Sequence, residues 1–317
     1  MKTTVIIPNY NGREYLKNCL DSLKEIVDES FETIVVDNGS KDNSLFMLEQ
    51  EYTWVRTIAL NENTGFAAAV NRGIEASNTE YVILLNNDTR VERGFVTELE
   101  RPLDEDKKVF SASARMVRMD NPDILDGAGD YFTILGWAYA RGKGKELGSK
   151  FNKPRNIFSA CGGAAIYRRE ALLAMGGFDE AHFAYLEDVD VGYRGKILGY
   201  KNVYAPASVC LHVGSGSSGS RYNEFKVKLS SRNNVYMVMK NMPLLQLLIN
   251  LPFLLLGYII KTIFFVKKGF GKIYVSGLIS GISLYFSEEG HRKKVGFKLK
   301  NLGNYIHIEL ELIANIL

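Results

Sequence analysis

Short apolar runs alternate with amphipathic patterns along the first third of the chain. β-branched and other apolar residues dominate five runs of strand length, at residues 3–8, 32–37, 55–60, 81–85 and 109–117. Between the first two runs, Leu16, Leu20 and Leu23 recur at helical spacing, which predicts an amphipathic helix. The connections between runs are short. This alternation predicts an α/β fold built on a mostly parallel sheet flanked by helices.

Polar residues gather where the predicted strands end. Residues 8–11, 37–40 and 86–88 follow three of the runs directly, as Pro-Asn-Tyr-Asn, Asp-Asn-Gly-Ser and Asn-Asn-Asp. The carboxyl ends of parallel strands lie at one edge of a sheet, and open α/β sheets bind their ligands beyond that edge. We therefore expect a nucleotide-like ligand there, with Asp37 accepting a hydrogen bond from its base or ribose.

Asp88 has the surroundings of a cation ligand. It closes an apolar run and follows Asn86 and Asn87, so hard oxygen atoms are grouped at that point. Proteins commonly hold Mg²⁺ or Mn²⁺ with one or two carboxylates plus substrate phosphates. Such a cation would act as a Lewis acid on a leaving diphosphate. His212 follows a predicted strand at residues 200–205. A lone histidine there is usually structural, but this one could also reach a metal held by Asp88.

Three carboxylates, Glu187, Asp188 and Asp190, fall within four positions, and Arg194 follows at helical spacing. Mutual repulsion raises the pKa of a carboxyl in such a group, which suits a general base working near neutral pH. The acidic first turn of a solvated helix explains the same residues. In the first interpretation, Asp188 removes a proton from an acceptor hydroxyl, and Arg194 or Arg72 balances phosphate or carboxylate charge.

The middle of the chain is less regular. Residues 120–151 are rich in glycine and have no clear period, which predicts loops and a hairpin over the site. Gly162 and Gly163 then precede an apolar run. Glycine lets a backbone approach a bound sugar closely, although close packing of one strand on another explains the pair equally well. Neither GxxxxGK[ST] nor GxGxxG follows the first strand, which speaks against ATPase and dinucleotide-binding functions.

Seven short motifs resemble those of the family 2 glycosyltransferases and occur in that family's order. They cover roughly residues 3–235 and read VIIPNYNG, VVDNGSKDNS, NTGFAAAVNRG, LLNNDT, GGAAIYRRE, GGFDE and EDVDVGYR. The resemblance implies the GT-A fold, binding of a nucleoside-diphosphate sugar, a DxD-type metal site at Asp88, a base at Asp188 and inversion at the anomeric carbon. NTGFAAAVNRG and SRNNVYMVMKN are most similar to rhamnosyltransferases that use dTDP-rhamnose to extend a lipid-linked saccharide.

The resemblance also places the remaining functional positions. Donor contacts are expected at Pro8, Asn9, Tyr10, Asn11, Asp37, Asn38, Gly65, Asn71, Arg72 and Asn87. Contacts with the transferred sugar or the acceptor are expected at Gly162, Gly163, Glu187, Asp190 and Arg194. Two departures from the family pattern matter. Asn86 stands in place of the first carboxylate of DxD, which leaves one acid for the metal. The missing QxxRW argues against a processive synthase.

The last part of the chain has a different pattern. Residues 244–260 carry no charge, residues 273–286 form a second apolar stretch, and basic residues flank both. Pro252 and Lys261 would be costly at membrane depth, and the second stretch is short for a span. We expect helices in the membrane interface with lysines on anionic headgroups. Packing in the core or in a homodimer interface is the alternative. The predicted domains are therefore a catalytic domain at 1–235 and a helical region at 236–317.

Composition limits the partners and the compartment. The net charge of +3 gives no reason to expect nucleic acid as a partner. From residue 261 onward, nine basic residues stand against four acidic ones, so the tail is positive. Three distant cysteines without CxxC indicate a reducing compartment rather than a disulfide framework or a zinc site. No apolar stretch of signal-peptide length precedes the first strand, so we expect the cytoplasmic face of the cell membrane.

Three functions compete at this point. The first is an inverting, metal-dependent glycosyltransferase acting on a lipid-linked saccharide, with dTDP-rhamnose favoured as donor and a UDP-hexose or UDP-galactofuranose as alternatives. The second is a nucleotidyltransferase, which loses support because residues 9–12 contain no lysine for a phosphate loop. The third is a non-catalytic scaffold that binds nucleotide sugars. The presence of both Asp88 and Asp188 speaks against a scaffold.

Overall fold

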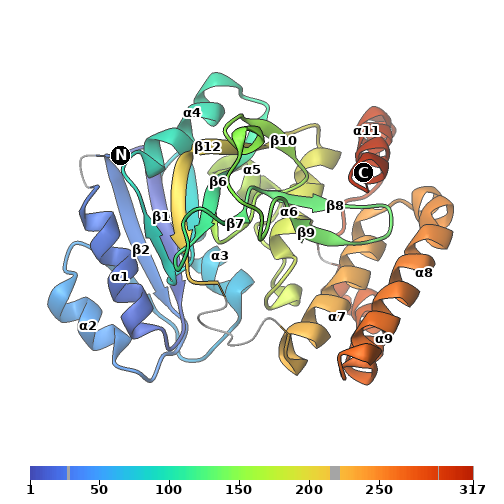
Figure 1. The fold of residues 1–317 in the computed structure, drawn as a ribbon, viewed down its shortest axis with the longest axis horizontal. Coiled ribbons are helices and arrows are strands. Elements are labelled where there is room, and N and C mark those ends of the chain that lie inside the picture. The colour runs from blue at the N-terminus through green and yellow to red at the C-terminus, as the bar shows by residue number, and fades with distance from the viewer. Residues whose placement is uncertain (27–28, 215–221, 292, 317) are drawn as a thin grey trace.

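The computed structural model describes residues 1–26, 29–214, 222–291 and 293–316 (Figure 1). In these residues one ten-stranded sheet has the order β10-β12-β6-β11-β4-β1-β2-β3, with β5 paired to β12 and β7 to β6. Its strands are β1 (Thr3–Asn9), β2 (Phe31–Asp37), β3 (Arg56–Ala59), β4 (Tyr81–Leu85), β5 (Thr89–Val91), β6 (Val109–Arg118), β7 (Leu125–Gly127), β10 (Arg155–Ile157), β11 (Ala164–Arg168) and β12 (Lys201–His212). The predicted strands of the first 117 residues are all present, with ends that differ by one residue at most.

The order of the strands brings their polar ends together. β1 lies between β2 and β4 and runs parallel to both, with Asn9 opposite Asp37. β6 and β12 are parallel, whereas β11 runs antiparallel between β4 and β6. The sheet is therefore mixed but mostly parallel, as the alternation of runs predicts.

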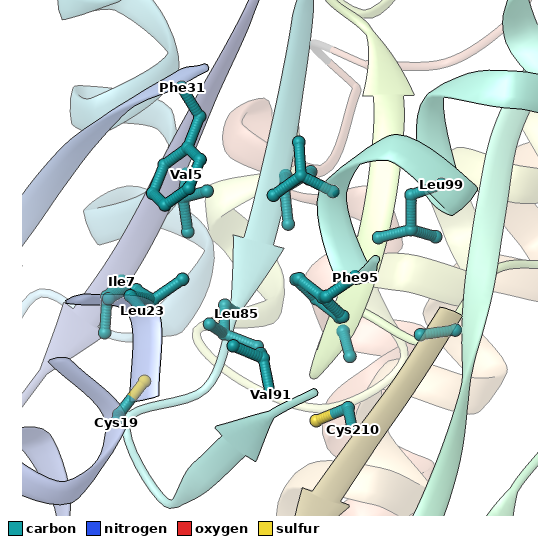
Figure 2. Close-up of a cluster of buried hydrophobic side chains, with 14 of the residues drawn as sticks. Val5, Ile7, Cys19, Leu23, Phe31, Leu85, Val91, Phe95, Leu99 and Cys210 are labelled. Carbon is teal, nitrogen blue, oxygen red and sulfur yellow. The ribbon is translucent and has the colours of Figure 1, made fainter. Parts of the chain in front are cut away.

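Both faces of the sheet are covered, which explains the uninterrupted apolar runs. Successive residues of β1 enter different clusters, Val5 and Ile7 on one face and Ile6 on the other. Figure 2 shows the first cluster, where Leu23 and Phe95 pack from helices over the strands. The helices of this lobe are α1 (Arg13–Lys24), α2 (Ser44–Glu51), α3 (Phe66–Ala76), α4 (Phe95–Glu105), α5 (Arg169–Ala174) and α6 (Glu187–Ile197).

The irregular middle of the chain forms the predicted hairpin. β8 (Asp130–Phe132) pairs antiparallel with β9 (Ala138–Ala140) as a separate two-stranded sheet. β12 is longer than the predicted strand at 200–205 because it continues to His212 and pairs there with Thr89 of β5. This extension carries His212 to the end of β4, where Asp88 lies.

The C-terminal part is helical, and its helices pack against one another at one end of the sheet (Figure 1). It contains α7 (Glu224–Asn241), α8 (Leu244–Lys267), α9 (Gly271–Phe286), α10 (Glu288–His291) and α11 (Leu302–Ala314). The domain boundary predicted at 235/236 falls inside α7. α7 also contacts α6, so this helix belongs to both parts of the molecule.

An apolar surface covers much of the outer face of these helices. α8 is long and apolar enough to cross a membrane, and only 17% of its most apolar window is buried. We call this surface the apolar helical face. Its exposed side chains on α8 include Leu244, Leu245, Leu248, Ile249, Leu255, Leu256, Ile259 and Ile263, joined by Val275, Ile279, Ile282 and Phe286 on α9 and by Ile306, Leu310 and Ile313 on α11.

Candidate active site

Hydrogen bonds between polar side chains connect the ends of three strands. The Asn9 amide donates to Asp37 Oδ2 at 3.0 Å and to Ser40 Oγ at 3.2 Å. The Asn87 amide donates to Asn9 Oδ1 at 2.7 Å. Asn9, Asp37 and Asn87 are all buried. The structure therefore brings these three predicted donor contacts into one connected group at the carboxyl edge of the sheet.

A second group of polar residues borders the first. Asn38 donates to Asn63 Oδ1 and to the Gly65 carbonyl, and its own Oδ1 accepts from the Thr64 N–H. Gly65 has a φ of +87°, and a Cβ there would come within 2.5 Å of the Phe183 carbonyl oxygen. A side chain at this position would thus clash with the segment that precedes Asp188.

The loop after β1 is open to solvent at its tip. Tyr10 is 44% exposed, which leaves its ring available to stack on a base. Asn11 is exposed, has a φ of +50°, and accepts a hydrogen bond from the Lys41 N–H. Pro8, partly buried in β1, leads into this loop. These residues border the Asn9–Asp37 pair, as their order in the chain requires.

Asn71 and Arg72 lie elsewhere. Asn71 exchanges two hydrogen bonds with the backbone of Phe178 and donates a third to Glu180. Arg72 is exposed and paired with Glu75 on its own helix. Neither side chain joins the strand-end groups. Asn71 instead fixes the segment at 178–180 to α3.

Asp88 and His212 form the metal-site candidate, and Asp126 completes it. His212 Nε2 lies 3.2 Å from Asp88 Oδ1, and His212 Nδ1 lies 2.7 Å from Asp126 Oδ2. Lys143 pairs with the same Asp126 carboxylate at 2.8 Å. Burial opposes a charge on His212, but hydrogen bonds to Asp126 and Asp88 outweigh it and raise the pKa of His212 to about 9. The sequence analysis did not identify Asp126, because this residue belongs to none of the recognised motifs.

The residues at Asp88 fit a divalent cation. A carboxylate oxygen and an imidazole nitrogen 3.2 Å apart have the separation of two adjacent ligands of one ion, about 3 Å when each ligand bond is about 2.1 Å. Asp126 would orient the imidazole through its other nitrogen, as carboxylates commonly do for metal-bound histidines. A histidine thus lies beside the single acid that remains at this site.

Asp188 lies in the first turn of α6 and is held by backbone donors. Its Oδ2 accepts from the Gly162 N–H at 2.9 Å, and its Oδ1 accepts from the Val189 N–H at 2.8 Å. Burial raises the pKa of Asp188 above the usual range, while these N–H groups oppose the rise. A carboxyl in this state is suited to accept a proton from a hydroxyl.

Gly162 and Gly163 link the two acidic ends of the site. The Gly163 carbonyl accepts from the Asn86 N–H at 2.9 Å, directly before the Asp88 turn, while Gly162 donates to Asp188. A Cβ at Gly163 would lie 3.1 Å from the Asn86 side chain. The close-packing interpretation applies to Gly163, which lies against Asn86, and the approach of a sugar to these glycines stays a prediction.

Further acidic groups surround Asp188. Asp130, which sequence reasoning missed, lies with Cys161 and Asp188 in one cluster whose ligand atoms are within 4.8 Å of one another. Burial, and then the charge of Asp188, raise the pKa of Asp130 well above its usual range. Burial and Asp188 do the same for Glu187. Among the described residues, no group bonds to Glu187 Oε2, which is buried.

Asp190 and Arg194 do not face this space. Both side chains have no exposed surface, and Arg194 Nε donates to Asp190 at 2.9 Å while its other nitrogens bond to backbone carbonyls. Lys240 of α7 pairs with Asp190 at 2.7 Å and also with Asp179. We therefore assign this pair to the support of α6, instead of the acceptor contact expected from the motif.

Comparison with known proteins identifies the family. The family described as Glycosyl transferase family 2 matches residues 4–176, which is more than half of the chain. The chain belongs to this family and is therefore a glycosyltransferase.

Curated relatives extend the comparison. An N-acetylglucosaminyl-diphospho-decaprenol L-rhamnosyltransferase of Mycobacterium tuberculosis is 27% identical over 240 residues, which are 68% of this chain and 77% of the relative. A poly-beta-1,6-N-acetyl-D-glucosamine synthase of Staphylococcus aureus is 22% identical over 212 residues, 65% of this chain and 48% of that protein.

A solved structure confirms the fold. A mannosyltransferase of Pyrobaculum calidifontis, in complex with GDP-Man and Mn²⁺, aligns over 98% of this chain and 87% of its own with a TM-score of 0.57 at 16% identity. The chain thus has the α/β fold of the GT-A glycosyltransferases, as the sequence motifs predict.

Proposed function

We propose that this protein transfers a sugar, with inversion at the anomeric carbon, from a nucleoside-diphosphate sugar to a hydroxyl of a lipid-linked saccharide. One observation carries the proposal: Gly162 and Gly163 join Asp188 to the strand end at Asn86 and Asp88 through two backbone hydrogen bonds. A general base and a cation-binding acid are thereby fixed at opposite sides of one short segment. That arrangement suits a reaction in which an acceptor oxygen attacks one face of the anomeric carbon while the diphosphate leaves from the opposite face.

The reaction divides between the two acids. Asp188 accepts the proton of the acceptor hydroxyl while the hydroxyl oxygen bonds to the anomeric carbon. At the same time, the bond from that carbon to the diphosphate oxygen breaks. Asp88 and His212 would hold Mg²⁺ or Mn²⁺, which neutralises charge on the diphosphate. Glu187 and Asp130, whose pKa values burial raises well above the usual range, lie near Asp188 and would bond to hydroxyls of the sugar or the acceptor.

The donor end follows from the strand-end groups. Tyr10 offers a face to the base, and the Asp37 carboxylate, fixed by Asn9, would accept a hydrogen bond from base or ribose. The rhamnosyltransferase relative supports L-rhamnose as the transferred sugar, and the sequence motifs favour dTDP-rhamnose as its donor. UDP-hexoses and UDP-galactofuranose are the competing donors, since uracil and thymine differ by a methyl group.

The apolar helical face supports a location at the membrane surface. We infer that α8, α9 and α11 lie in the interface of the cytoplasmic leaflet, with the exposed Lys267, Lys268 and Lys272 on anionic headgroups. This placement would bring the active site to a lipid-linked acceptor. The name of the rhamnosyltransferase relative includes a decaprenol-linked acceptor, which is consistent with a lipid-linked acceptor here.

Nucleotide release from a panel of donors tests the proposal. dTDP-rhamnose, UDP-hexoses, UDP-galactofuranose and GDP-sugars are incubated with detergent-solubilised lipid-linked acceptors, with Mn²⁺ or Mg²⁺ and then with chelator. We expect acceptor-stimulated release from one donor, lost on chelation. Nucleotide binding without release from any donor would instead support a non-catalytic scaffold.

A further inference from the structure

The segment just before Asp188 has an unusual backbone. Phe183, Tyr185 and Leu186 have φ values of +61°, +72° and +67°. Phe183 has a ψ of −63°, and the Ala184 N–H donates to the His182 carbonyl at 2.7 Å, which makes Phe183 the centre of a γ-turn. Residues with a Cβ rarely adopt such conformations, so neighbouring groups must hold this segment.

One side chain of α7 supplies much of that hold. Asn233 is fully buried, and its amide nitrogen donates to the carbonyls of His182 at 2.9 Å and of Ala184 and Tyr185 at 2.8 Å. Arg232 donates to the His182 carbonyl as well, at 2.9 Å. The carbonyls of His182, Ala184 and Tyr185 thus accept hydrogen bonds from two adjacent residues of one helix.

The same face of α7 continues past Asp188. The Asn241 amide donates to Asp190 at 2.7 Å, two residues beyond the base. Lys240 pairs with Asp190 and with Asp179, so contacts from α7 lie on both sides of the Asp188 turn. These contacts account for much of the motif SRNNVYMVMKN, which the donor and metal sites do not use.

We propose that Asn233 is a positioning residue for the transfer reaction: it fixes the turn at 183–186 so that Asp188 keeps its place in the first turn of α6. The inference rests on the function proposed above. Asn233 acts through this turn, so we expect its removal to lower turnover more than nucleotide affinity. A displacement of a reacting group by about 1 Å lowers the rate by about a hundredfold.

Asn233→Asp tests this role, because it keeps the size of the side chain and removes both N–H donors. Asn234→Asp is the matched control, since the neighbouring Asn234 is equally part of α7 but donates to the Gly136 carbonyl in the hairpin. Both full-length variants are assayed for kcat and for the Kd of UDP and dTDP. Hydrogen exchange of amides at 181–190 is measured on the same samples.

We expect kcat of Asn233→Asp to fall by about tenfold to a hundredfold with an unchanged nucleotide Kd, and exchange at 181–186 to accelerate. Asn234→Asp should keep the wild-type kcat and exchange. The proposal would be overturned if Asn233→Asp kept both the wild-type kcat and the wild-type rate of exchange. It would also be overturned if nucleotide affinity and kcat fell by the same factor. Where Asn233→Asp does not fold, Arg232→Lys replaces it with the same expectation. Absence of turnover in the wild type is a failure of the proposed function, and the exchange data then decide the role of Asn233 alone.

Discussion

Carboxylates at this site differ in charge because their neighbours differ. Asp188 and Asp130 are partly buried, and burial is the main cause that raises the pKa of each, although Lys143 opposes the rise at Asp130. Asp190 is fully buried, but Lys240 and Arg194 outweigh that burial and lower its pKa. Proton transfer needs a group of the first kind, whereas a permanent ion pair needs one of the second kind. Both kinds occur on α6, at Asp188 and, two residues later, at Asp190.

Asp126 is expected to set the metal affinity without touching the metal. Asp126→Asn keeps the shape of the side chain but weakens its bond to His212 Nδ1, so the imidazole loses its orientation. Loss of such a partner typically weakens metal binding by about 10-fold to 100-fold. Titration calorimetry with Mn²⁺ in the presence of UDP measures the change. An unchanged Mn²⁺ affinity would remove Asp126 from the site.

His182 is expected to make the protein sensitive to mild acid. Burial lowers its pKa to about 4, although Asp190 and Asp179 oppose the shift, while Lys240 and Arg194 add to it. The unfolded chain binds a proton near pH 6.5, so this contribution to stability is present above pH 6.5 and is lost as pH falls toward 4. Between pH 7 and pH 5 the loss is about 2 kcal/mol.

Denaturant unfolding at the two pH values checks this expectation. His182→Phe removes the titrating group, so its free energy of unfolding should change less between pH 7 and pH 5 than that of the wild type. An equal change in both proteins would show that His182 is not the group responsible.

Among the secondary-structure elements, α7 connects the two parts of the molecule. Its one face bonds to the turn before Asp188, and its other face packs on α9. Gly277 and Gly281 of α9 permit this approach, because a Cβ at Gly281 would lie 2.3 Å from the Arg232 carbonyl oxygen. A change at this contact is therefore transmitted to a residue that also bonds to His182.

Gly281→Ala is expected to destabilise the protein by about 1–3 kcal/mol, the usual cost of overpacking a tight contact. Gly303→Ala serves as the control, since a Cβ at this α11 glycine meets no atom within 4 Å. Alanine is the better helix former, so this second change should stabilise by about 0.5 kcal/mol. Thermal or denaturant unfolding measures both, and equal effects would contradict the contact.

Sequence patterns predict the elements well because strands and helices depend on nearby residues. The strand ends at 8–11, 37–40 and 86–88 meet as predicted, since parallel pairing requires it. The roles of Asp126, Asp190 and Asn71 could not be predicted in this way. Their partners come from distant elements: Asp190 is neutralised by Lys240, and Asp126 meets His212 only because β12 continues beyond its predicted end.

At the scale of the whole molecule, α7 connects the lobe that holds the polar site with the helices that carry the apolar surface. The strand-end groups bind the soluble donor in the proposal, and the helices at the other end of Figure 1 face the lipid. The protein is then expected to bind vesicles, more strongly when they contain anionic phosphatidylglycerol and less strongly at high salt.

Leu248→Asp combined with Ile279→Asp should abolish this binding, because both exposed side chains belong to the apolar helical face. Phe46→Asp is the control, an equally exposed apolar residue on α2 in the other lobe, and should bind as the wild type does. Vesicle co-sedimentation provides the measurement. A stable dimer in ultracentrifugation, with no vesicle binding, would support the homodimer interface instead.

Turnover and nucleotide binding of Asp188→Asn test the central claim most directly. The substitution keeps the size of the side chain and removes the proton acceptor, and general bases contribute about 10² to 10⁴ in rate. With the donor identified in the panel, saturating acceptor and Mn²⁺, we expect kcat to fall by at least that lower factor while UDP or dTDP binds as tightly as before. Wild-type turnover in Asp188→Asn would show that another group takes the proton and would contradict this account of the site.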